Sequence, residues 1–307
     1  MTGTAVSAWR LDRGASGWPD RLEHLGVPPS ALWLRGALPS QEAPGVAIVG
    51  SRQASFGALR SARELARELA GCGITVISGM ARGIDAEAHL GALEGGGPTI
   101  AVLGCGIDIC YPREHLRLRD RIAALGCVIS EDGGGEPPER WRFPRRNRLI
   151  AAFAEAVVVV EATASSGALS TARWAADLGR EVLAMPGSIR NPTSAGTNLL
   201  IRDGVRPFLV TADLFESVPA LRRAFSAHLS LDITGGSEAE IERAGAGLEE
   251  DPTLRSVLDR LGSDPIHPDD LAAALGVAAG PLAAALTTLQ VRGAIAEVCG
   301  GRVVRTF

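Results

Sequence analysis

The segment from Arg140 to Arg148, RWRFPRRNR, places five arginines, one tryptophan and one phenylalanine within nine residues. Positive charges this close repel one another unless an anion neutralises them, and the rings between them offer flat faces on which bases can stack. Single-stranded nucleic acid would meet both requirements. The alternative interpretation is a solvated basic turn beside ordinary core aromatic residues. The candidate binding residues of this segment are Arg140, Arg142, Phe143, Arg145, Arg146, Asn147 and Arg148.

The charge of the whole chain limits what such a site can be. The formal net charge is −4 at pH 7, which argues against a protein that coats duplex DNA through a uniformly positive surface. A nucleic-acid site must therefore be a local groove on an acidic body. The chain contains 31 arginines and no lysine. Each arginine has a planar guanidinium group that can donate two parallel hydrogen bonds to a phosphate, and chemistry that requires lysine is excluded.

Composition also narrows the class of protein. The 307 residues are enough for about two domains, and an apolar share of 46% is ordinary for a globular protein with a full core. No apolar run approaches the length of a signal peptide or a membrane-spanning helix, so we expect a cytoplasmic protein that does not enter a membrane. The five cysteines include no CxxC pair, and we expect neither a metal site nor a cofactor.

Short apolar runs alternate with helical patterns through the first two thirds of the chain. Phe56 to Leu69, for example, has Leu59, Ala62, Ala66 and Leu69 at helical spacing. Such alternation predicts an extended, Rossmann-like, doubly wound α/β sheet with helices on both faces, over residues 45–227. Residues 1–44 are expected to form short helices packed on this core. The predicted strands are Val46–Gly50, Ile74–Gly79, Thr99–Gly104, Cys127–Ser130, Val157–Glu161 and Glu181–Met185.

The last third of the chain has a different pattern. Residues 228–250 are acidic and rich in glycine, as is typical of a linker. Residues 251–307 then show helical patterns at 254–261, 268–275 and 281–292, followed by two strand patterns around a Gly-Gly turn, which predicts a small winged-helix-like domain. Its six acidic residues against five arginines favour a contact with protein over the reading of duplex DNA.

Residues suited to anions follow several of the predicted strands. In a doubly wound sheet, ligands bind at the carboxyl ends of the strands, where helix N-termini offer free amide groups. Each of these turns alone could be ordinary turn chemistry, but together they indicate one anion-binding edge. The turns are Gly50-Ser51-Arg52, Ser78 to Asp85 with Arg82, the arginine segment leading through Asn147 into a helix near Leu149, and Ala164 to Thr171 with Ser166 and Gly167. Asn198 and Arg202 are expected in the same neighbourhood.

These blocks together resemble the DNA-processing protein A (DprA/Smf) family over roughly residues 45–215. The resemblance rests on VGSR at 49–52, SGMARGID at 78–85, AVLGCGIDICYP at 101–112, FPRRNRLIA at 143–151, VVVEA at 158–162, SGALSTA at 166–172, and MPGS followed by GTNLLI. It implies a Rossmann-like core that binds single-stranded DNA, protects incoming DNA, forms a homodimer and loads the RecA recombinase in natural transformation. It also implies no catalytic turnover and no cofactor, and the family often carries a C-terminal winged helix.

The resemblance assigns roles to matching positions. Gly50, Ser51, Arg52, Arg82 and the arginines of the 140–148 segment would bind backbone phosphate, and Phe143 would stack on a base. Asn147 would orient the loop, while Ser166 and Gly167 would line the same groove. The stretch SEDGGGEPPER at 130–140 departs from the proline-rich form expected there, and residues 1–44 are too short for the extra N-terminal domain of some relatives; both departures concern partner contacts more than DNA binding.

Other functions of a Rossmann-like fold remain as alternatives. A nucleotide phosphoribohydrolase needs a Gly-Gly-x-Gly-Thr loop and a following glutamate, but the corresponding region reads SSGALSTARW and no acid follows until Asp177. A dinucleotide-dependent oxidoreductase needs GxGxxG after the first strand, where only Gly50 is present. A nucleotide-sensing module that uses the same phosphate loops is the third possibility.

Overall fold

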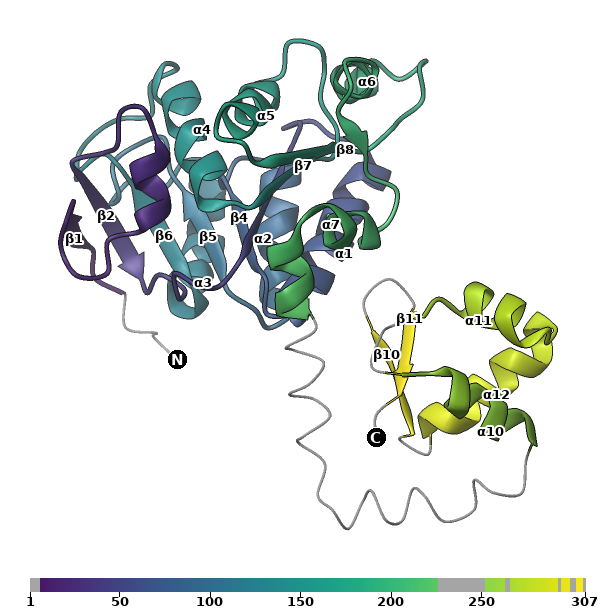
Figure 1. Ribbon diagram of the computed structural model, residues 1–307. Coiled ribbons are helices and arrows are strands. Elements are labelled where there is room, and N and C mark those ends of the chain that lie inside the picture. The colour runs from purple at the N-terminus through teal and green to yellow at the C-terminus, as the bar shows by residue number, and fades with distance from the viewer. Residues whose placement is uncertain (1–5, 226–251, 263–265, 292–293, 299–301, 306–307) are drawn as a thin grey trace. The chain divides into compact units, whose positions relative to one another are not determined.

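The computed structural model describes residues 6–225, 252–262, 266–291, 294–298 and 302–305 (Figure 1). It divides into two compact units, 1–225 and 226–307, which are described separately. The predicted linker, residues 228–250, lies outside the described residues.

The first unit is built on a nine-stranded sheet with the order β1-β2-β6-β5-β4-β3-β7-β8-β9. Neighbouring strands from β6 to β9 are parallel, and β2 and β1 continue the sheet in antiparallel pairing beyond β6. This confirms the predicted α/β class and the six predicted core strands. The strands are β1 (Trp9–Asp12), β2 (Ala31–Gly36), β3 (Gly45–Val49), β4 (Thr75–Ser78), β5 (Thr99–Val102), β6 (Cys127–Ser130), β7 (Ala156–Val159), β8 (Glu181–Ala184) and β9 (Arg206–Pro207).

Helices cover both faces of this sheet (Figure 1). Strand residues point alternately to the two faces, so Ile100 and Val102 pack with α4 and α5, whereas Ala101 and Leu103 pack with α2 and α3. Because both faces are covered, the parallel strands from β3 to β8 are apolar except at some of their end residues, which are Thr75, Ser78, Thr99, Ser130 and Glu181. The helices are α1 (Phe56–Gly71), α2 (Ile84–Glu94), α3 (Leu116–Leu125), α4 (Arg142–Phe153), α5 (Ala168–Asp177), α6 (Ala195–Arg202) and α7 (Ala212–Ser217), with 3-10 turns η1 (Asp20–His24), η2 (Arg113–His115) and η3 (Pro192–Ser194).

The expectation of short helices in residues 1–44 is wrong. The segment supplies β1 and β2, with only the single turn η1 between them. Leu32 and Leu34 are fully buried while Trp33 and Arg35 between and after them are partly exposed, which is the period of two that a strand requires. The residues therefore extend the sheet rather than form a separate helical layer on it.

Helix α4 begins earlier than predicted. We expected a loop up to Leu149, but the helix starts at Arg142 and contains most of the arginine segment. Pro144 does not prevent this because it lies in the first turn, where backbone N–H groups have no partner within the helix. The arginines are thus spread around a helix instead of converging from a loop.

The second unit has a core of its own. Helices α10 (Pro252–Arg260), α11 (Pro268–Leu275) and α12 (Ala279–Val291) pack with the antiparallel hairpin β10 (Ile295–Val298) and β11 (Arg302–Arg305). Ile266 adds a bridge to Val303. The predicted winged-helix-like order is confirmed. No single helix in the described ranges is long and apolar enough to cross a membrane, although the pair Pro268–Leu275 and Ala279–Gln290, bent by 115°, passes on length and composition.

Candidate functional site

A small aromatic and cationic pocket lies at the carboxyl edge of the sheet. Its aromatic wall consists of Phe143, from the first turn of α4, and Tyr111, whose ring centre is 5.7 Å from that of Phe143. The guanidinium carbon of Arg52 lies 5.3 Å from the centre of the Phe143 ring. We call this the Phe143 pocket; it is lined by Arg52, Gly79, Ala81, Arg82, Leu103, Gly104, Tyr111, Pro112 and Phe143.

Gly104 is what allows the Phe143 ring to lie against the end of β5. A Cβ atom on Gly104 would come within 2.9 Å of the ring, closer than carbon atoms normally approach. The ring is therefore packed on backbone along one side and only partly buried. A ring held in this way loses little conformational entropy when a base stacks on it.

The backbone that carries Arg52 is held by the neighbouring loop. Gly83 has a positive φ of 75°, and a Cβ atom there would lie 2.3 Å from the carbonyl oxygen of Ser51. The Ser51 amide donates to the carbonyl of Glu161 at 2.7 Å, and its carbonyl accepts from Ile84 at 3.2 Å. Gly50 is closely packed as well, since a Cβ atom would lie 2.6 Å from Ile84. The loop is rigid, but the Arg52 side chain is exposed.

Arg52 and Arg82 are the cations of the pocket that a phosphate can reach. Arg52 forms no ion pair with any residue that the structure describes. Arg82 pairs with Glu114, and both side chains are more than half exposed, so exchange of this partner for a phosphate would cost little. The loop that carries Arg82 is strained, because the buried Met80 has a φ of 54°, and its carbonyl accepts a hydrogen bond from His115 Nδ1 at 3.0 Å.

The arginines of α4 have a different environment, because the preceding loop neutralises most of them. Arg142 contacts Asp132 at 2.8 Å, Glu136 at 2.5 Å and Glu139 at 3.4 Å. The segment 131–148 contains five arginines and four acidic residues, a net charge of +1. The remaining pairs are Arg145 with Glu131 at 2.7 Å and Asp132 at 3.6 Å, and Arg148 with Glu131 at 2.6 Å. The exposed Arg140 has no partner among the described residues.

Arg146 is buried and joins the ends of two strands. Its Nη1 donates to the carbonyl of Gly79 at 2.8 Å and to that of Val102, and its Nε donates to Asn147 Oδ1 at 3.2 Å. Burial lowers the pKa of Arg146 to about 10, opposed by the attraction of Asp85. The pKa of Asp85 is raised by burial, against the opposing effect of Arg146. The Arg146 charge thus positions the floor of the pocket and is not presented to solvent.

The other predicted residues lie along the same edge but outside the Phe143 pocket. Asn147 donates to the carbonyl of Gly167 at 3.2 Å and to Ser170 Oγ at 2.7 Å, so it connects α4 to the start of α5. Ser166 Oγ accepts from the amide of Ala168. Asn198 holds both backbone groups of Gly187, at 3.1 and 3.0 Å. Their contacts fix loops, and none of them lines the pocket.

The N-terminus of α1, where a Rossmann-type protein would hold a nucleotide phosphate, already contains a carboxylate. Glu161, at the end of β7, is buried and accepts from the amide of Ser55 at 3.2 Å and from its hydroxyl at 2.6 Å. Ser55 is the N-cap of this helix. A phosphate at this position would meet a negative charge, which counts against the nucleotide-binding alternatives.

Two features of the site were missed from the sequence. Tyr111 is the only tyrosine in the chain and lies in the AVLGCGIDICYP block, so its position beside a predicted strand end was a usable signal. The acidic residues of 131–139 were also visible, but their pairing depends on where α4 begins.

The fold and site define an α/β protein with an extended Rossmann-like sheet, a winged-helix unit and a cationic aromatic pocket at the carboxyl edge. Its sequence matches the family described as DNA recombination-mediator protein A over residues 10–219, and the DprA winged helix domain over residues 242–301. The chain therefore belongs to the DprA/Smf family of DNA recombination mediators.

Individual relatives agree with this assignment. Protein Smf of Synechocystis sp. is 34% identical over 94% of this chain and 78% of that protein. The X-ray structure of DNA processing protein A from Streptococcus pneumoniae matches with a TM-score of 0.64 and 36% identity, covering 68% of this chain and 74% of that one. A Helicobacter pylori DNA processing protein A, described for its single-stranded DNA binding mode, matches with a TM-score of 0.62 and 28% identity, covering 69% and 95%.

Proposed function

We propose that this protein binds single-stranded DNA at the Phe143 pocket and loads the RecA recombinase onto the bound strand. In the same proposal it protects incoming DNA in natural transformation, acts as a homodimer in the cytoplasm and has no catalytic turnover. The DNA-binding part is supported by the chemistry of the pocket and by the Helicobacter pylori relative. The RecA, dimer and transformation parts are supported by family membership alone.

The observation that carries the proposal is the exposed guanidinium of Arg52 next to the Phe143 ring, with no carboxylate paired to it among the described residues. When the exposed Arg52 side chain turns from the ring to an adjacent phosphate, a base can stack on the ring in its place, which is how single strands are held without sequence preference. Arg82 supplies a second phosphate contact on the opposite loop. Duplex DNA has its bases stacked internally, so it would lose the ring contact, and we expect a preference for single strands.

The test is fluorescence anisotropy of a labelled oligo-dT strand and of a matching duplex across a salt series, with purified full-length protein and no nucleotide. Tight, salt-dependent binding that favours the single strand is the expected result. Equal affinity for duplex and strand would contradict the role of base stacking, and binding to neither would reject the proposal.

The contribution of the C-terminal unit can be separated from that of the core. We propose that the core binds the strand and that the winged-helix unit contacts protein, because its charge is balanced. Removal of His228 to Phe307 should therefore leave the affinity for oligo-dT within about twofold, a change of roughly 0.4 kcal/mol. Loss of binding in this truncated protein would show that the strand site includes the second unit.

RecA loading needs an assay of its own. We expect the protein to stimulate RecA-dependent strand exchange on DNA already covered by single-strand-binding protein, and sedimentation to give the mass of a dimer. The Arg52→Ala variant should lose the stimulation but remain dimeric. Normal stimulation by a variant that no longer binds oligo-dT would contradict loading through this pocket.

A further inference from the structure

Three exposed arginines follow one another along η2 and α3. Arg113 lies in the 3-10 turn η2, and Arg117 and Arg121 lie one helical turn apart on α3. Their side chains form no ion pair or hydrogen bond with any residue that the structure describes. We call these three residues the α3 arginine row; it presents three positive charges to solvent.

The acidic residues of the same stretch are bonded to other arginines. Glu114 pairs with Arg82, and Asp120 pairs with Arg119 at 2.9 Å. Residues 113–121 contain four arginines and these two acidic residues, so their net charge is +2. Unlike the arginines of α4, the α3 arginine row is therefore not neutralised by carboxylates that are close to it in sequence.

One acidic residue of the neighbouring helix α2 also acts on the row. The pKa of Glu94 is lowered mainly by the hydrogen bond from Arg63 and, to a smaller extent, by the charge of Arg121. Arg63, on α1, pairs with Glu87 of α2 as well, at 3.1 Å. Because Arg63 already holds the Glu94 carboxylate, a phosphate can bind to Arg121 without breaking an ion pair.

The row also weakens the helix that carries it. Arg117 lies in the first turn of α3, which contains no acidic residue, and the positive end of the helix dipole repels it. Arg117 and Arg121 are like charges at i and i+4, a spacing at which they destabilise a helix. Both unfavourable effects decrease when an anion lies along the row.

The row begins at the wall of the Phe143 pocket. Tyr111 and Pro112 line that pocket, and Arg113 is the next residue of the chain. Helix α3 then connects the carboxyl edge of β5 to the start of β6, and these two strands are parallel, so the helix leads away from the pocket along the sheet. A strand with a base in the pocket can therefore continue onto the row.

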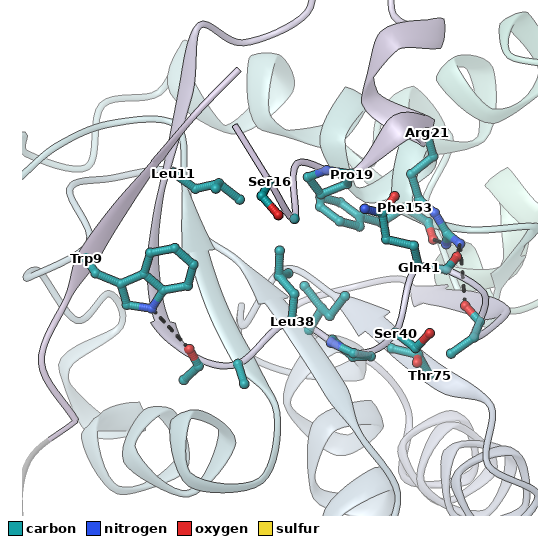
Figure 2. Close-up of a pocket in the computed structure, with 16 residues that line it drawn as sticks. Trp9, Leu11, Ser16, Pro19, Arg21, Leu38, Ser40, Gln41, Thr75 and Phe153 are labelled. Atoms are coloured by element: carbon teal, nitrogen blue, oxygen red, sulfur yellow. Dashed lines mark hydrogen bonds between the residues drawn. The ribbon is translucent and has the colours of Figure 1, made fainter. Parts of the chain in front are cut away.

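An arginine in the largest pocket of the described residues is used differently. Arg21 lines this pocket, whose volume is about 350 Å³, at the amino edge of the sheet (Figure 2). Its Nη1 donates to the carbonyl of Phe153 at 2.6 Å, and its Nη2 donates to that of Gln41 at 2.7 Å. Arg21 thus holds backbone segments together, whereas the donors of the α3 arginine row remain available to a ligand.

We propose that the α3 arginine row binds the phosphates of a single strand whose base occupies the Phe143 pocket, so that the strand leaves the pocket along α3. This inference rests on the proposed function and extends it. Four residues of α-helix span about 6 Å, close to the spacing of neighbouring phosphates in an extended strand, so Arg117 and Arg121 can bind successive phosphates. A single line of cations matches one backbone and not the two backbones of a duplex.

The variant Arg117→Gln tests the contact, because it removes the charge and keeps a side chain that suits a helix. In fluorescence anisotropy with full-length protein and labelled oligo-dT, the slope of log affinity against log salt should become shallower by about 0.7, and by about 1.4 when Arg121→Gln is added. The matched control is Arg173→Gln. Arg173 is exposed and has no ion pair within the described ranges, and it lies on α5, which covers the opposite face of the sheet. Its slope should not change.

The stability of the DNA-free protein gives an independent readout. Arg117→Gln removes the repulsion by the helix dipole and by Arg121, so Tm should rise by about 1–2 °C while DNA binding weakens. Arg119→Gln is the contrast on the same helix, since Arg119 is buried and bonded to Asp120, and it should lower Tm. A lower Tm in Arg117→Gln would show that Arg117 supports the fold, which would contradict the inference.

The outcomes separate this inference from the proposed function. If the original protein binds oligo-dT tightly and the double variant keeps its salt slope, DNA binding stands and the path along α3 is wrong. An equal change of slope in Arg173→Gln would reveal an effect of net charge alone, and a larger loss for duplex than for oligo-dT would assign the row to duplex; both would overturn the inference. Failure of the original protein to bind oligo-dT would reject the proposed function itself.

Discussion

The carboxyl edge of the sheet holds two sets of arginines whose surroundings differ. In the first turns of α4, Arg142, Arg145 and Arg148 each pair with carboxylates from the preceding loop, and Arg146 is buried against backbone carbonyls. In the loops after β3 and β4, Arg52 has no ion pair among the described residues and Arg82 has only an exposed one. A dense run of arginines in the sequence is therefore a poor guide to positive potential on the surface.

The comparison also separates two kinds of role. The α4 arginines attach the helix to the sheet and to the acidic loop, which places Phe143 at the edge. Arg52 and Arg82 stand on closely packed loops with their side chains in solvent. A phosphate can replace water beside Arg52, or the exposed Glu114 beside Arg82, at small cost. Substitutions in the first set should change stability, and those in the second should change DNA binding.

The largest expected effect is on Arg146, the member of the first set that donates to backbone carbonyls instead of pairing with carboxylates. Arg146→Met would leave the carbonyls of Gly79 and Val102 without their donor, and we expect the free energy of unfolding to fall by about 3 kcal/mol. Urea unfolding followed by circular dichroism measures this. The control Arg140→Met, on an exposed side chain without a described partner, should change the value by less than about 0.5 kcal/mol. Equal losses of unfolding free energy in the two variants would contradict the difference between the buried Arg146 and the exposed Arg140.

The stability of the fold should also decrease in acid, because of the buried His89. His89 is fully buried. The Thr99 hydroxyl donates its hydrogen to the carbonyl of Val76, so the Thr99 oxygen accepts from His89 Nδ1 at 2.8 Å. His89 Nε2 is then unprotonated, and it has no hydrogen-bond partner among the described residues. Burial, with smaller contributions from His115 and Arg146, lowers the pKa of His89 to about 3. The folded protein thus binds fewer protons than the unfolded chain, and stability present above pH 6.5 is lost as the pH falls toward 3.

The size of that loss follows from the pKa difference. At pH 5 it should reach about 2 kcal/mol relative to pH 7, in addition to the contributions of other groups. His89→Gln keeps a side chain that can bond to Thr99 but cannot titrate, so its unfolding free energy should fall less between pH 7 and pH 5. Parallel pH profiles for the two proteins would mean that His89 is protonated in the folded state.

A smaller effect is expected at Phe143, the aromatic residue beside Arg52. Phe143→Leu keeps apolar contact with Gly104 but removes the stacking face, and we expect oligo-dT affinity to fall about tenfold with little change in its salt dependence. Phe143→Tyr, which keeps the ring, should bind within about twofold of the original protein, a difference of roughly 0.4 kcal/mol. If the Phe143→Leu variant binds oligo-dT as tightly as the Phe143→Tyr variant does, the Phe143 ring packs in the fold without stacking on DNA.

The sequence was informative where local pattern and burial coincide. The strands β3 to β8 are short runs buried on both faces, so their apolar residues are continuous and their positions could be predicted. The second unit was also readable, because proline and glycine mark the ends of α11. Residues 31–36 alternate as a strand, but Pro28 and Pro29 and the short surrounding segments obscured a pattern that only pairing with β6 makes clear.

The candidate site was less predictable for a physical reason. Side-chain partners depend on helix phase, and the start of α4 at Arg142 instead of Leu149 decides which arginines face the carboxylates of 131–139. The close spacing of the five arginines in residues 140–148 suggested that they share one role. The structure instead gives Arg146 a buried position and Arg142 three acidic neighbours. Arg52 and Phe143 were chosen from separate blocks, and the structure places them in contact.

The smallest effect is the most direct test of the comparison, because it uses two partly or fully exposed arginines on the same edge. Arg52→Ala removes a cation that has no described ion pair, so the slope of log affinity for oligo-dT against log salt should become shallower by about 0.7. Arg145→Ala removes one that Glu131 and Asp132 already neutralise, so its slope should stay the same. An unchanged slope in Arg52→Ala would reject its phosphate contact; an equal change in both variants would mean that DNA displaces the carboxylates and that the α4 arginines take part in binding after all.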